Sequence, residues 1–313
     1  MLQKFLLTKK HGKRWLNVSK KNFLSFFVLI LGLIICFSGC QTLQSVNNFS
    51  AASVLPQDAD LYVRLPVKTN QALCETLLSA YLPDLTDSNK QKLIVSAETV
   101  FAAVKTGENG KKSVNLAVEG KFPFYTNFVL TDKNGWSKAT KKEGSIKYMY
   151  YVHDTGFQLA IPTSNIVLLS SDSVLPMLHN CEENVLNNIT GVEQVSKREA
   201  LLTSNIDSVS FYSENPKAFI KSMIGLDISF GVAEAGGVLT SKKGDSANNL
   251  DYNLDMEFVL SEPRAIKATT FIVKSLFSAI SSNIIIEQKG DDTLACKNIT
   301  VTENAVLSLI MGK

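Results

Sequence analysis

Hydrophobic and polar residues alternate along short stretches of this chain. In the segments between these stretches, hydrophobic residues recur at helical spacing. Residues 60–66 alternate as a short strand, and the leucines within 73–81 line one face of a helix. The second half repeats this order. Residues 207–212 alternate, and 215–225 follow as a helix that begins at an Asn-Pro cap and ends at glycine.

Each strand–helix pair is followed by two strands around a polar turn. In the first half, residues 100–104 and 114–118 flank a Gly-Glu-Asn-Gly turn at 107–110, which predicts a β-hairpin. In the second half, residues 228–232 and 250–259 flank a polar stretch. Gly236-Gly237 within that stretch predicts a tight turn, although glycine also permits close backbone approach.

Landmarks further along keep a nearly constant offset between the two halves. Pro123 and Pro263 each follow a strand and begin a predicted helix, and they lie 140 residues apart. The Asp-Thr pairs at 154–155 and 292–293 are offset by 138. The common order predicts an internal duplication. The alternative is that any two α+β stretches contain such landmarks.

The predicted fold class is α+β, built from two duplicated β-α-β-β-α-β-β units. We expect mostly antiparallel sheets with helices on one face, and we leave open whether the units share one sheet. The first unit covers residues 56–185 and the second 206–313, joined by a polar linker at 186–205. The length of 313 residues, with 45% hydrophobic and 19% charged residues, suits two modest globular units.

The N-terminal segments follow one another in the order typical of a secretory signal peptide. Seven basic residues and no acid precede an apolar run at 23–37, which would span roughly 22 Å as a helix, short of a ~30 Å bilayer core. Small residues Ser38 and Gly39 follow, and then Cys40. This pattern predicts a signal peptide over residues 1–39.

The segment Phe37-Ser38-Gly39-Cys40 resembles the lipobox of bacterial lipoproteins, in the looser form known among spirochaetes, because Phe37 stands where Leu or Val is usual. The resemblance implies that the signal peptidase recognises Phe37, Ser38 and Gly39, and that Cys40 carries fatty acyl chains such as palmitate. Membrane lipid is then a partner, with two or more chains making attachment lasting. Residues 40–55 would be the lipidated tether. We therefore expect a cell-envelope protein on the outer membrane or periplasmic face.

Residues 55–63, where the first predicted unit begins, contain Pro-Gln-Asp-Ala followed by a strand. This segment resembles the start of uncharacterised bacterial envelope families that repeat a similar unit. That resemblance implies no activity. Without the leader the formal charge is about −4, so the composition gives no reason to expect nucleic-acid binding.

Motifs for catalysis, metals or cofactors are absent from the sequence. It contains no Gly-x-Ser-x-Gly elbow and no His-x-x-x-His spacing, so we expect neither an enzyme nor a metal or cofactor site. His153 beside Asp154 is interpreted as an exposed turn pair. Cys74, Cys181 and Cys296 are spaced too widely for Cys-x-x-Cys chemistry and are interpreted as buried free thiols.

One apolar segment, residues 265–280, could act on a membrane as well as in the protein core. It predicts either a core helix or an amphipathic helix that enters lipid, and core packing is the favoured interpretation. The residues concerned are Ile266, Phe271, Ile272, Leu276, Phe277 and Ile280.

The sequence thus predicts a non-catalytic, membrane-anchored lipoprotein that binds or scaffolds an envelope protein or lipid. The alternative is a lipid-handling or membrane-perturbing lipoprotein using apolar helices. An apolar cavity between sheet and helices would favour lipid handling, whereas a solid core would favour scaffolding.

Overall fold

The computed structural model describes the body of the chain in nine stretches. Residues 45–313 form one of the two units into which the chain divides, separate from residues 1–44. The described residues all belong to the unit of residues 45–313: 50–81, 85–107, 111–122, 130–190, 197–214, 216–217, 231–242, 251–278 and 283–311. Phe37, Ser38, Gly39 and Cys40 lie outside these stretches, so their predicted roles remain predictions.

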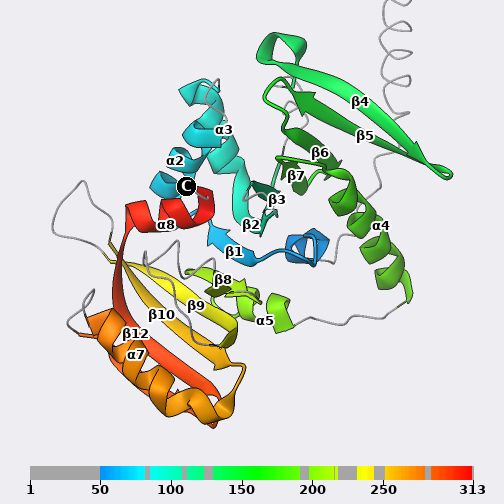
Figure 1. Cartoon of the computed structure of the whole chain (residues 1–313). Helices are drawn as coiled ribbons and strands as arrows, with labels where there is room; N and C mark the ends of the chain where they lie inside the picture. The colour runs from blue at the N-terminus through cyan, green and yellow to red at the C-terminus, as the bar shows by residue number, and fades with distance from the viewer. Residues whose placement is uncertain are drawn as a thin grey trace, which may run out of the picture. The chain divides into compact units, whose positions relative to one another are not determined.

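A 12-stranded sheet forms the framework of the body, and every neighbouring pair of strands is antiparallel (Figure 1). The predicted α+β class is therefore confirmed. The strands are β1 (Leu61–Pro66), β2 (Ala97–Thr106), β3 (Lys112–Gly120), β4 (Trp136–Glu143), β5 (Ile146–His153), β6 (Gln158–Thr163), β7 (Ile166–Ser170), β8 (Val209–Ser213), β9 (Val232–Lys242), β10 (Asp251–Leu260), β11 (Ile285–Lys289) and β12 (Thr293–Thr302).

The two halves of the chain meet in the middle of this sheet. Strands β1 and β8 pair at the centre, β2-β3-β7-β6 continue on one side, and β9-β10-β12-β11 continue on the other. The hairpin β4–β5 extends the first side and has no counterpart among the described residues of the second half. Buried Arg64 on β1 joins the halves, because its guanidinium donates to the carbonyl oxygens of Asn205 at 2.7 Å and Ile206 at 3.0 Å.

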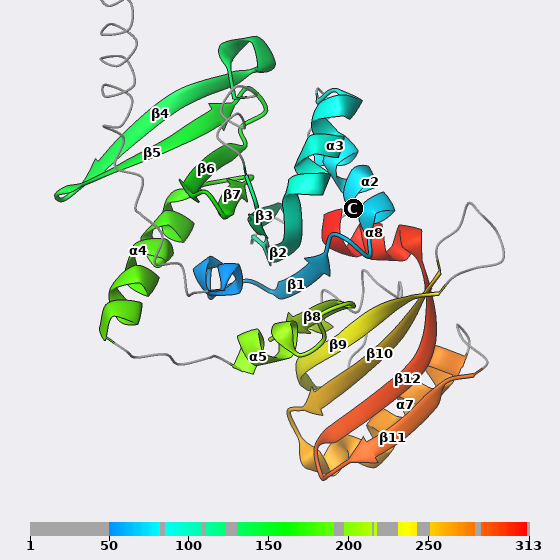
Figure 2. The same ribbon diagram turned by 180° about the vertical axis from the view of Figure 1, so that it is seen from behind.

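Helices cover both faces of the sheet. One core contains residues of α2, α3, α7 and α8, and the other contains residues of η1, α4 and α5. Helix α7 lies in front of β12 in Figure 1 and behind it in Figure 2. The helical elements are η1 (Ala51–Val54), α2 (Gln71–Tyr81), α3 (Asp87–Ser96), η3 (Asp132–Asn134), α4 (Leu175–Thr190), α5 (Lys197–Thr203), η4 (Pro263–Ala265), α7 (Ile266–Ser278) and α8 (Glu303–Met311).

The prediction of helices on one face was therefore wrong. The reason lies in β1, which is buried along its whole length. Tyr62 belongs to one core and Val63 to the other, so this strand is covered on both sides. The predicted linker at 186–205 also differs, because it includes the end of α4 and all of α5, whose Leu202 is fully buried in the core with Tyr62.

Strand β9 corrects the prediction for the second hairpin. It begins at Val232 rather than Ile228, and Gly236-Gly237 pair with both β8 and β10 instead of forming a turn. A Cβ on Gly237 would lie 2.4 Å from the Asp255 carbonyl oxygen, so the strands approach too closely there for a side chain. The helix predicted to precede this strand lies outside the described residues, apart from Pro216 and Lys217.

Candidate functional site

An apolar pocket lies between α2, α3 and one face of the first half of the sheet. Its volume is about 170 Å³. This exceeds the ~150 Å³ of an engineered apolar cavity that stays dry and binds benzene, so the pocket has room for part of an acyl chain. All the side chains that line it are apolar, including those of Val63, Leu77, Ala102, Leu116 and Trp136.

Two local sequence patterns build this pocket. Cys74, Leu77 and Leu78 stand at helical spacing on α2 and form one wall. Alternate residues of the strands form the floor, where Ala102 pairs with Val63 on one side and Leu116 on the other. Thr86 caps the N-terminus of α3, which brings Leu93 and Ile94 over the same floor. The pocket is therefore a consequence of ordinary amphipathic patterning.

Trp136 on β4 forms the far wall and packs against His153. The two rings are 4.7 Å apart between centroids. His153 is buried, and its Nδ1 lies 2.7 Å from the Thr155 hydroxyl oxygen and accepts the Thr155 backbone N–H at 3.2 Å. The interpretation of His153 as an exposed turn residue was therefore wrong. It closes the β5–β6 turn from the inside, supported by Trp136, while Asp154 is exposed.

Cys74, Cys181 and Cys296 are buried free thiols, as the sequence predicts. Burial raises the pKa of each to about 12. A thiol with such a pKa remains protonated near neutral pH and is a weak nucleophile. Cys74 thus contributes an apolar surface to the pocket.

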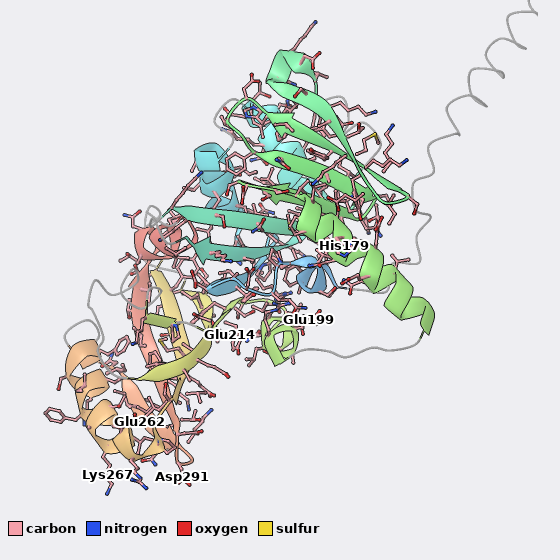
Figure 3. The ribbon with its side chains drawn as sticks, turned by 45° about the vertical axis from the view of Figure 1, so that its right-hand side comes forward. His179, Glu199, Glu214, Glu262, Lys267 and Asp291 are labelled. Carbon is pink, nitrogen blue, oxygen red and sulfur yellow. The ribbon has the colours of Figure 1, made fainter. Side chains whose placement is uncertain are left out.

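Helix α7 has one buried and one exposed apolar face. Ile266 and Phe277 are buried, as core packing requires, whereas Phe271 is 72% exposed and Ile272 is 40% exposed. Lys267 lies at the outer surface of the same helix (Figure 3). Among the residues predicted for this segment, Ile280 and the side chain of Leu276 lie outside the described part of the structure.

The described residues show neither a metal cluster nor a membrane-spanning helix. No group of three or more His, Cys, Asp or Glu side chains among them is arranged to hold a metal ion. Among the same residues, no helix has both the length and the apolar character needed to cross a bilayer.

The fold and the site together define an α+β protein with an internal pocket for apolar groups. The family described as outer membrane-associated lipoprotein TP0453 matches residues 46–307, and this chain belongs to that family. The protein is thus a bacterial lipoprotein of the spirochaete type located in the cell envelope, and the predicted class and location are confirmed.

A solved structure described as crystal form I of TP0453 is similar in fold. It is 17% identical to this chain with a TM-score of 0.60, and the match covers 85% of this chain and 98% of that chain. At this identity the likeness concerns the fold alone. No curated protein matches the chain.

Proposed function

We propose that this lipoprotein binds an apolar ligand, an acyl chain or a similar hydrocarbon, in the pocket beneath α2 and α3, without catalysis. The observation that carries the proposal is the wholly apolar lining of a cavity of about 170 Å³. A buried polar group would cost free energy there because the described lining side chains are hydrocarbon apart from the Trp136 indole N–H and the Cys74 thiol. Lipid handling is therefore favoured over scaffolding, which would need no such cavity.

The proposal keeps Cys40 as the acylated first residue of the mature chain. The family is membrane-associated, and the lipobox-like segment supports this cysteine as the point of attachment. Mass spectrometry of the native protein tests this directly. It should find an N-terminal peptide that begins at Cys40 and carries fatty acyl groups, whereas an unmodified Cys40 or an intact leader would contradict the proposal.

Ligand binding is tested by filling the pocket. Ala102 lines it, so Ala102→Phe places a ring in the space that the ligand would occupy. Ala139 on β4 points to the opposite face of the sheet from Trp136, and Ala139→Phe is the matched control. Residues 41–313 suffice for the assay, because both large cores lie between residues 51 and 307.

The assay is quenching of Trp136 fluorescence by bromododecanol. Trp136 is the one tryptophan in residues 41–313, and it lines the pocket. Ala102→Phe should weaken binding by about tenfold or more, while Ala139→Phe should bind like the parent chain. The melting temperature of Ala102→Phe should stay the same or rise, since cavity filling commonly stabilises. Undiminished binding by the folded Ala102→Phe variant would refute the proposal.

A second candidate function is membrane perturbation by α7. The observation that favours it is the exposed Phe271, with Ile272 beside it and Lys267 and Lys274 on the same helix, an arrangement typical of helices that enter the lipid interface. Leakage of a dye from liposomes by residues 41–313 tests this function. Phe271→Ser should abolish leakage, and a chain that causes none would remove the candidate.

We also infer that the body arose by duplication of a β-α-β-β-containing unit. The identical strand order on either side of the β1–β8 pair supports this inference. The Asp-Thr pairs do not, because residues 154–155 lie between β5 and β6, whereas Asp292 directly precedes β12 and Thr293 begins it, which is a different position in the unit. An alignment of homologues in which the two halves score as related to each other would test the inference, and unrelated halves would contradict it.

A further inference from the structure

A row of paired residues leads from the pocket to the edge of the sheet. Leu116 pairs with Leu169, and Leu169 with Leu159, all of which line the pocket. The row continues through Tyr151 on β5 to Lys138 on the edge strand β4. Directly paired residues lie on the same face, and strands are ~4.8 Å apart, so Lys138 lies roughly 10 Å beyond Leu159.

Two further lysines share this face of the β4–β5 hairpin. Lys142 stands four residues after Lys138 on β4, and Lys147 is its partner on β5. All three lysines are exposed, and no described carboxylate lies within 4.0 Å of their ammonium groups. Lys141 on the opposite face differs, because its ammonium group lies 2.8 Å from the Glu143 carboxylate. The positive charge therefore lies on the face that leads to the pocket.

Protection of the sheet edge explains the presence of these lysines but not the placement of two of them directly opposite each other. Lysine on an edge strand discourages unwanted pairing, which accounts for Lys138 and Lys142 on β4. It also accounts for Lys147, because β5 pairs with β6 only at Tyr151 and Val152 and lies at an edge around Lys147. Like charges directly opposite each other destabilise a sheet, so the Lys142–Lys147 pair carries a cost that a bound anion would relieve.

We propose that the ligand is an amphiphile with an anionic head group, a phosphate or a carboxylate. Its hydrocarbon chain lies in the apolar pocket, and its head group is bound by Lys138, Lys142 and Lys147. This inference rests on the proposed apolar-ligand function. The lysines supply long-range attraction and charge-assisted hydrogen bonds, and the pocket supplies the burial of apolar surface.

The test compares one hydrocarbon with and without its charge. Residues 41–313 are titrated with bromododecyl phosphate, with uncharged bromododecanol, and with inorganic phosphate as a competitor, using quenching of Trp136 fluorescence. The variants are Lys138→Gln/Lys142→Gln/Lys147→Gln and the control Lys141→Gln on the opposite face. The triple variant should bind bromododecyl phosphate about tenfold more weakly than the parent. Its affinity for bromododecanol should be unchanged, and Lys141→Gln should match the parent with both probes.

Each other outcome has a distinct meaning. Unchanged affinity of the triple variant for bromododecyl phosphate would overturn the inference but leave the pocket function intact. An equal loss for both probes would also overturn it, since the lysines would then act on the fold. Displacement of the probe by equimolar inorganic phosphate would show that the site recognises free anions rather than amphiphiles. Binding of neither probe by the parent chain would overturn the pocket function and the inference together.

Discussion

Two phenylalanines on helix α7 provide a matched pair for testing its two faces. Phe277 is fully buried, and its ring packs on Phe258 with the centroids 6.4 Å apart. Its replacement by alanine removes a core ring and leaves a cavity, which typically costs about 3–5 kcal/mol. Phe271 is 72% exposed, so Phe271→Ala should change the free energy of unfolding by less than about 0.5 kcal/mol.

Urea denaturation followed by far-UV circular dichroism measures the difference. With a slope of about 3 kcal/mol/M, Phe277→Ala should lower the midpoint by about 1 to 1.7 M, and Phe271→Ala should leave it within experimental error. The slopes of the variants should equal that of the parent, which shows that the denatured state is unchanged. Equal midpoints for the two variants, or a larger loss for Phe271→Ala, would refute the assignment of the buried and exposed faces.

Four further predictions concern the anchor, the thiols and the sheet. Cys40→Ser should move the protein from the membrane to the soluble fraction after cell fractionation; full retention in the membrane would contradict acylation at this residue. Cys74, Cys181 and Cys296 should react slowly with a thiol reagent at pH 8 and rapidly in urea, because burial raises each pKa from 9.0 to about 12; fast reaction of the folded chain would show accessible thiols. The folded chain also keeps thiol protons that the unfolded chain loses, so the free energy of unfolding should fall as the pH rises from 9 to 12; a value rising over that range would contradict this. Gly237→Ala should destabilise by about 1–3 kcal/mol in a urea titration, because the added Cβ meets the backbone of β10; a neutral effect would mean that the strands lie further apart.

Hydrophobic periodicity and turn residues in the sequence correctly predicted single helices and hairpins between neighbouring strands. The β2–β3 hairpin follows from alternation on both sides of a short polar turn, and α2 follows from leucines at helical spacing. Two residues singled out for core packing on α7, Ile266 and Phe277, are buried. The exposure of Phe271 is not evident from the sequence, because an apolar residue on a helix shows nothing of what faces it.

Pairings between distant segments could not be predicted in this way. The β1–β8 contact joins Val63 to Phe211, and no periodicity specifies a partner across such a separation. The pocket has the same origin, since its walls come from α2, α3 and strands up to β7. The burial of His153 depends on Trp136 from the neighbouring strand, so adjacency to Asp154 alone suggested an exposed turn.

Photo-crosslinking tests the central claim, that the pocket holds an apolar chain, most directly. A fatty acid carrying a diazirine at its terminal carbon would be bound to residues 41–313, irradiated, and the labelled peptides identified by mass spectrometry. The account predicts labels on α2, α3 and the strands facing them, with Ala102→Phe abolishing them. Labels confined to the outer face of α7 around Phe271, and unaffected by Ala102→Phe, would contradict it.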